Sequence, residues 1–310
     1  MNAFAEDPTS ETTKSGDPSG AAPEHASVEH YSALEAGAER DLAAEIRIKP
    51  IDANVPAVVG LPISPVLEDP AWNALDVVRL TVLTVISLFL GVFAALFLAR
   101  WLLYPHTPLG DLARVPLVIV AGQGLAYVLI LGYMFVLVTR ERHRPDFLTA
   151  IHWNWPQSPA VYLLIGVVLS VALQILASRL PIPKNLPIDT FFRTPAEAWA
   201  LTIFGIVLAP LMEELFFRGF LYPVLERGMG VPLAVFFTAV AFALLHGWQL
   251  MFSWGPVLVI FLVGLVLTTV RAKTNSVAAG LLIHIAYNGA ISALMFFATD
   301  GFRHLEKLNQ

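Results

Sequence analysis

Seven long apolar stretches constrain the possible folds of this chain more than any other feature. About 20 apolar residues in a helix cross roughly 30 Å of hydrocarbon. Stretches of about that length lie at residues 77–100, 115–139, 159–178, 198–226, 231–247, 256–271 and 276–298. The sequence therefore predicts an all-α fold, a polytopic integral membrane bundle of about seven transmembrane helices, within a range of six to eight.

The composition agrees with a membrane protein and limits the available chemistry. Hydrophobic residues make up 56% of the 310 positions and charged residues only 14%, a balance outside the usual range of soluble domains. The chain has no cysteine, which excludes disulfides, thiolate metal ligands and cysteine nucleophiles. Any catalysis must use hydroxyl, carboxylate or imidazole groups, or a metal-bound water.

The first 76 residues differ from the rest in charge and hydropathy. Residues 1–76 hold 14 of the 24 acidic residues but only 4 of the 19 Lys and Arg, so this segment carries −10 and the remainder +5. Such a polar, acidic segment buries too little apolar surface to fold, and we expect a disordered tail. The segment lacks the basic stretch followed by an apolar stretch that is typical of a cleaved secretory signal, so we expect the first membrane segment to act as its own insertion signal.

The loops between the apolar stretches indicate an orientation. The most basic loop is "TRERHR" at 139–144, and the loops that alternate with it carry Arg227 and then Arg271 with Lys273. Basic loops lie on the cytoplasmic side, which also puts the N-terminal tail in the cytoplasm, although the opposite loops carry basic residues too. We expect the Pro-rich segment 179–199 to be an interfacial loop or a short surface helix.

Ionisable and amide side chains interrupt the last four apolar stretches. A charged group at membrane depth costs several kcal/mol unless it is paired, so it indicates a functional site. Glu214 and Arg218 are four residues apart and can pair along one helix. Glu213 points about 100° away from Glu214, so it needs a partner on another helix, for which a histidine is suitable.

The remaining polar groups lie at a depth similar to that of Glu213. Counting 1.5 Å per residue from the nearest turns, Glu213, His246, His284 and Asn288 fall within about 10 Å of depth. His284 and Asn288 also share a helix face. A carboxylate beside an imidazole can deprotonate a water, and further donors can stabilise the oxyanion that forms in peptide hydrolysis. The alternative is a purely structural ionic cluster that fixes helix register.

Three motifs resemble those of a known family. "EELFFR" at 213–218, "FALLH" at 242–246 and "HIAYN" at 284–288 resemble the EExxxR, FxxxH and HxxxN motifs of the CPBP family. This is the group of CAAX prenyl proteases and bacteriocin-processing proteins, also called the Abi or type II CAAX protease (Rce1-like) family. The motifs occur in the family's order on successive apolar stretches.

The resemblance implies an all-helical intramembrane endopeptidase. It implies that Glu213 and His246 activate the attacking water, that His284 and Asn288 hold the oxyanion, and that Glu214 and Arg218 support Glu213. On this basis the chain divides into four parts, which are the tail 1–76, accessory transmembrane helices at 77–178, a CPBP-like protease core at 179–298 and a C-terminal tail at 299–310.

Several alternatives stay open at the level of sequence. Glu213, His246 and His284 would also suit Zn²⁺ as two histidines and a carboxylate, although the HExxH signature is absent; we favour a metal-independent glutamate mechanism and predict no firm cofactor. We expect membrane lipids and a membrane-associated peptide or protein as partners, no nucleic acid, and a bacterial inner membrane, where prenylated substrates are not expected. A catalytically inactive scaffold or immunity protein is the main alternative, and a small ion-coupled transporter is a weaker one.

Overall fold

The computed structural model describes residues 69–181, 183, 192 and 194–306. All of them belong to one compact unit, residues 66–310. The predicted disorder of residues 1–68, residues 182, 184–191 and 193 of the predicted interfacial segment 179–199, and the last four residues therefore lie outside the described part of the chain.

The described residues are helical and contain no strand. Seven helices are long and apolar enough to cross a membrane, and their ends lie within three residues of the predicted ones. They are α2 (Ala74–Leu102), α4 with its π-helical end η1 (Pro116–Glu141), α6 (Pro159–Ala177), a long helix at Pro195–Met229, α10 with the 3₁₀ turn η5 (Val231–Leu250), α11 (Trp254–Thr274) and α12 (Val277–Ala298). The prediction of an all-α integral membrane bundle is confirmed.

Helix α2 begins before the predicted end of the tail. Asn73 caps its first turn, and Asp76 completes a capping box, which satisfies backbone N–H groups that the helix leaves unpaired. Trp72 is buried, and its Nε1 donates a hydrogen bond of 3.0 Å to the carbonyl of Phe220. The boundary at residue 76 is therefore wrong, because residues 69–76 are an ordered part of the helical unit.

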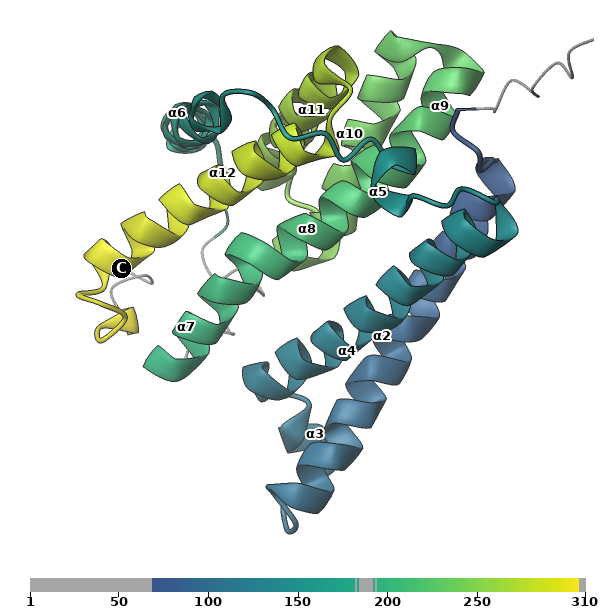
Figure 1. The fold of residues 1–310 in the computed structure, drawn as a ribbon. Coiled ribbons are helices and arrows are strands. Elements are labelled where there is room, and N and C mark those ends of the chain that lie inside the picture. Colours follow the sequence, from purple (N-terminus) through teal and green to yellow (C-terminus); the bar gives the residue numbers. More distant parts are fainter. Residues whose placement is uncertain (1–68, 182, 184–191, 193, 307–310) are drawn as a thin grey trace, which may run out of the picture. The chain divides into compact units, whose positions relative to one another are not determined.

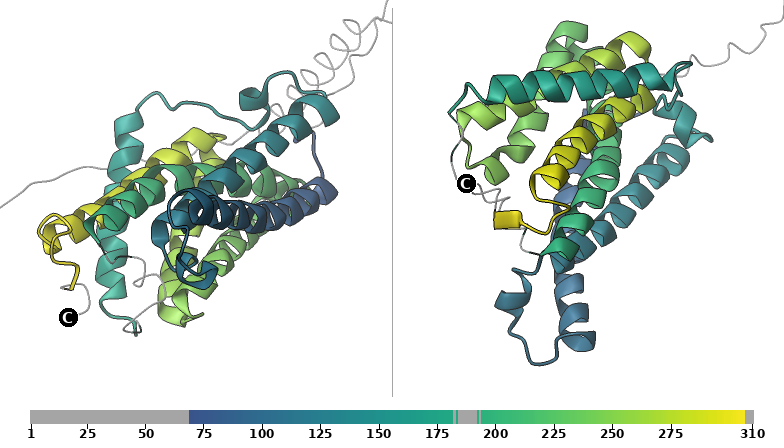
Figure 2. Two further views of the ribbon diagram at one scale, coloured as in Figure 1. Left: turned by 90° about the horizontal axis from the view of Figure 1, so that it is seen from below. Right: turned by 90° about the vertical axis from the view of Figure 1, so that its left-hand side faces the viewer.

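Close helix pairs are formed where glycines remove side chains. Helix α2 packs along α4 (Figure 1), and a Cβ on Gly91 would lie 2.3 Å from the carbonyl oxygen of Gly122. Helix α6 crosses α12 in equally close contact, since a Cβ on Gly166 would lie 2.4 Å from the carbonyl oxygen of Ile283. Figure 2 shows these pairs from two other directions. Small residues at such contacts are typical of membrane helices.

The outer faces of the bundle are apolar. Phe89 and Phe93 of α2 are more than half exposed, as are Leu164 and Val168 of α6. Because lipid tails are as apolar as these side chains, such faces suit a hydrocarbon environment. The buried clusters lie inside, one between α2, α4 and the long helix and another between α6, α10, α11 and α12.

The long helix contains two π-helical segments. It runs through α7 (Pro195–Ile203), the π-helical η3 (Phe204–Leu208), α8 (Ala209–Glu214), the π-helical η4 (Leu215–Leu221) and α9 (Tyr222–Met229). Pro210 and Pro223 follow the two π-helical segments and have no N–H to donate, which locally interrupts α-helical hydrogen bonding. Short π-helical segments are frequent at functional sites, and these two flank the "EE" pair.

Two short helices complete the described chain, α3 (Leu109–Leu112) and α5 (Phe147–Ala150). The segment predicted as a C-terminal tail packs on the bundle in its first part. Phe302 is buried, with its ring against those of Trp199 and Phe296.

Candidate active site

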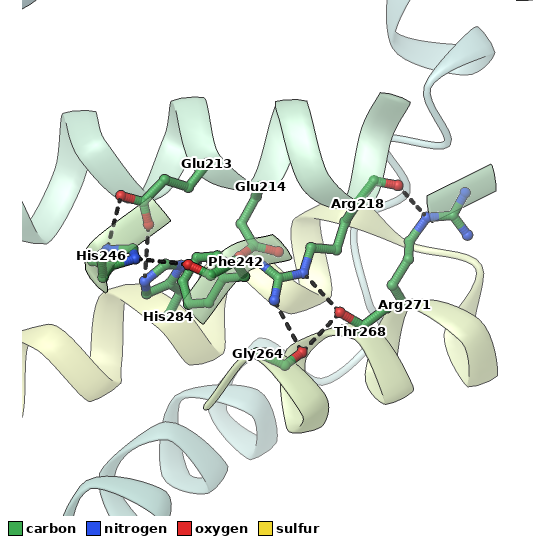
Figure 3. A network of polar contacts seen from close by, with 9 residues as sticks. All are labelled: Glu213, Glu214, Arg218, Phe242, His246, Gly264, Thr268, Arg271 and His284. Carbon is green, nitrogen blue, oxygen red and sulfur yellow. Dashed lines mark hydrogen bonds and ion pairs between the residues drawn. The ribbon is translucent and has the colours of Figure 1, made fainter. Parts of the chain in front are cut away.

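Glu213 faces two histidines from two other helices. It lies on α8, His246 lies at the end of α10, and His284 lies on α12 (Figure 3). Its Oε1 is 3.7 Å from Nε2 of His246, and its Oε2 is 3.6 Å from Nε2 of His284. The partner predicted for Glu213 on another helix is therefore present twice, and the geometry does not favour His246 over His284.

The hydrogen bonds of the two rings fix which nitrogen faces Glu213. Nδ1 of His246 lies 3.0 Å from the carbonyl of Phe242, and a carbonyl can only accept, so this nitrogen carries the hydrogen. Nδ1 of His284 lies 2.9 Å from Oε1 of Glu214, where an ionised carboxylate likewise accepts. In the neutral form of each ring, Nε2 therefore presents a lone pair towards Glu213.

The site is partly open on one side and closed on the other. The side chains of Glu213 and His246 are 16% and 22% exposed, whereas His284 is 4% exposed and Glu214 is fully buried. Glu213 and His246 are thus partly accessible, while the groups behind them are shielded from solvent.

Glu214 and Arg218 form the pair that their spacing predicts. Nη1 of Arg218 donates to Oε1 of Glu214 over 2.8 Å, and both side chains are fully buried. Arg218 also donates to the carbonyl of Gly264 (3.0 Å) and to the hydroxyl of Thr268 (3.2 Å), both on α11. A buried charge is stable only with such partners, so this network locks the long helix to α11.

The contacts of Asn288 differ from the predicted arrangement. Its amide Nδ2 donates to the carbonyl of Gly205 in η3 over 2.7 Å. Within the described part of the chain, no hydrogen bond or ion pair joins Asn288 to Glu213, His246 or His284. The spacing of His284 and Asn288 predicts a shared face, but the structure gives the two side chains different partners.

The same part of the chain matches a known family. Residues 195–290 match the model described as Type II CAAX prenyl endopeptidase Rce1-like. The chain carries an Rce1-like region. The match runs from the first turn of the long helix past Asn288. It confirms the resemblance that the three motifs indicate at the level of the Rce1-like family, and it does not assign the chain to the Abi group in particular. The comparisons with curated proteins and with solved structures gave no match.

The Rce1-like region contains donor types that a metal takes. Two imidazole nitrogens and a carboxylate are ligands that Zn²⁺ takes. Among the described residues, however, no group of three or more His, Cys, Asp or Glu side chains is arranged to hold a metal ion. Without a metal, Glu213, His246 and His284 can act on a water through their own carboxylate and imidazole groups.

Sequence reasoning assigned no role to Phe242, although it is the first residue of "FALLH". Its ring contacts both histidines, at centroid distances of 4.9 Å from His246 and 5.8 Å from His284. The guanidinium of Arg218 lies 4.7 Å from its centroid, a cation–π contact. Phe242 thus contacts both the partly exposed His246 and the buried Arg218. The one sequence signal for this contact is its position four residues before His246, which puts both on one helix face.

Proposed function

We propose that this chain is an intramembrane endopeptidase that hydrolyses a peptide bond by a glutamate-activated water. The observation that carries the proposal is the Glu213 carboxylate, whose oxygens lie 3.7 and 3.6 Å from Nε2 of His246 and His284. The Rce1-like match over these residues supports the reaction class.

A water between these groups would complete their hydrogen bonding. The two Nε2 atoms and the carboxylate are all acceptors when the rings are neutral. Separations of 3.6 and 3.7 Å exceed a direct hydrogen bond, and a water has two hydrogens to donate. Glu213 acts as the general base, and His246 is the second acceptor that orients the water.

Hydrolysis then follows in three proton transfers. Glu213 takes a proton from the water as its oxygen attacks the peptide carbonyl carbon, and the carbonyl oxygen becomes negatively charged. The second N–H of the Asn288 amide, whose first N–H donates to Gly205, stabilises this oxyanion, as does Nε2 of His284 when the ring is protonated on both nitrogens. Glu213 returns the proton to the peptide nitrogen and the C–N bond breaks, which gives a carboxylic acid and an amine. The acid then passes its proton to the amine, and a carboxylate and an ammonium group leave.

Glu214 and Arg218 act behind the reacting groups. The Glu214 carboxylate holds Nδ1 of His284 at 2.9 Å, and Arg218 holds the same carboxylate oxygen at 2.8 Å. Because all three side chains are buried or nearly so, this chain of contacts fixes the orientation of the His284 ring towards Glu213.

The surroundings of the site support a membrane-associated peptide or protein as the substrate, because the reactive groups lie on helices that can cross a membrane. We assign the basic loops and the N-terminus to the cytoplasm and the protein to a bacterial inner membrane. Arg142 pairs with Asp76, and Arg227 donates to the carbonyls of Pro70 and Trp72. The start of α2 and two of the basic loops therefore share one end of the bundle, as this orientation requires.

The experiment is cleavage of a quenched peptide library by the full chain purified in detergent. Wild type is compared with Glu213→Ala and His246→Ala, and with Glu141→Gln as a control for a carboxylate that is 44% exposed and lies outside the site. Loss of cleavage in the two site variants alone supports the proposal. Equal turnover in all four proteins refutes it, and no cleavage by wild type favours an inactive scaffold.

A further inference from the structure

Gly280 lies against the buried carboxylate of the site. It is on α12, one turn before His284, and it is buried. A Cβ built on Gly280 would lie 2.6 Å from Oε2 and 3.5 Å from Cδ of Glu214. The carboxylate thus occupies the space that any side chain at position 280 would take.

The hydrogen bonds of Glu214 all fall on its other oxygen. Oε1 accepts from Arg218 (2.8 Å) and lies 2.9 Å from Nδ1 of His284. Oε2 is buried and has no hydrogen-bond partner among the described residues. Oε2 therefore lies where it does because position 280 has no side chain, and not because a polar partner holds it there.

We propose that Gly280 is a positioning residue for the reaction, and that its missing side chain seats the Glu214 carboxylate so that His284 faces Glu213. This inference rests on the proposed peptidase function. Gly280 does not touch the reacting groups, and it acts through Glu214 and then through the Nδ1 hydrogen bond of His284.

An added methyl group would force one of two displacements. To restore an ordinary contact of 3.4 Å, Oε2 and the new Cβ must separate by roughly 0.8 Å, in an interior that is close-packed. If the carboxylate moves, Oε1 shifts relative to Arg218 and His284. If α12 moves instead, it carries His284 with it. Either displacement changes the 3.6 Å separation between Nε2 of His284 and Glu213.

The same helix offers a matched control. Gly289 is also on α12, and a Cβ there would have no atom within 4 Å. In a helix with free space, alanine is more stable than glycine. Gly289→Ala therefore reports the effect of the substitution without the clash.

The first measurement is peptide cleavage by Gly280→Ala and Gly289→Ala, each in wild-type and Glu214→Asp backgrounds. Misplacement of a catalytic group by about 1 Å can reduce the rate about 100-fold, so we expect Gly280→Ala to lower kcat by about 10- to 100-fold with KM nearly unchanged. Gly289→Ala should stay within about twofold of wild type. Because aspartate is one methylene shorter and keeps the charge, Gly280→Ala should cost at most about threefold more in the Glu214→Asp background.

The second measurement is thermal unfolding of the same four variants, which needs no catalytic activity. Gly280→Ala should lower the Tm in the wild-type background and lower it less with Glu214→Asp, whereas Gly289→Ala should leave it unchanged or raise it. Unchanged kcat in Gly280→Ala, or an equal loss with and without Glu214→Asp, overturns the proposal. If wild type cleaves no peptide, the proposed peptidase function is refuted. The role of Gly280 is then tested by unfolding alone, and an equal fall of the Tm for Gly280→Ala in both backgrounds refutes its contact with Glu214.

Discussion

Arg218→Met tests the buried network most severely, because it removes the charge and keeps an apolar stem. Thr268 keeps its hydrogen bond to the carbonyl of Gly264 (2.8 Å) without the arginine, so neither of these partners is orphaned. Glu214 loses its cation and stays buried, with one oxygen already unpaired. Breaking one partner of a buried pair costs about 3–5 kcal/mol, and we expect a loss of unfolding free energy of about that size.

The assay is reversible unfolding of the full chain in mixed micelles. The control is Arg79→Met, since the side chain of Arg79 is 52% exposed and lies 3.7 Å from Asp76. Asp76 is buried but keeps its pair with Arg142 when Arg79 is replaced, and a contact of a half-exposed arginine contributes at most about 1 kcal/mol. If Arg218→Met loses no more stability than Arg79→Met, the network does not have the structural role assigned to it.

Three further predictions concern other parts of the account. Gly91→Ala should destabilise the protein by about 1–3 kcal/mol through overpacking against α4, whereas Gly124→Ala, with open space around it, should not; equal unfolding free energies would contradict the packing. Asn288→Ala should lower kcat about 100- to 1000-fold, as loss of an oxyanion donor does, and an unchanged kcat would remove Asn288 from the mechanism. Exhaustive chelation should leave peptide cleavage undiminished, and a loss that Zn²⁺ restores would contradict the glutamate mechanism.

The sequence predicted the features that depend on local periodicity. Apolar length alone located all seven spans, because a helix needs a fixed number of residues to cross the hydrocarbon. The spacing of Glu214 and Arg218 predicted a pair that the structure places at 2.8 Å. The need of Glu213 for a partner on another helix followed from the angle between adjacent residues.

Features that depend on packing between helices could not be predicted. The nitrogen of His284 that faces Glu213 depends on a hydrogen bond to Glu214, and the partner of Asn288 depends on a carbonyl in a π-helical segment. Gly280 shares a helix face with His284 by its spacing of four residues, but spacing does not indicate that a carboxylate from another helix lies against it. The early start of α2 was in principle readable, because Asn73 and Asp76 have the spacing of a capping box.

The central claim is that the Glu213 carboxylate activates the water. Its most direct test is kcat for Glu213→Gln on one peptide that wild type cleaves, because glutamine keeps the shape of the side chain and removes its basicity. General base catalysis contributes about 10²- to 10⁴-fold, so we predict a loss in that range beside a folded protein with unchanged Tm. A kcat within threefold of wild type would contradict the account.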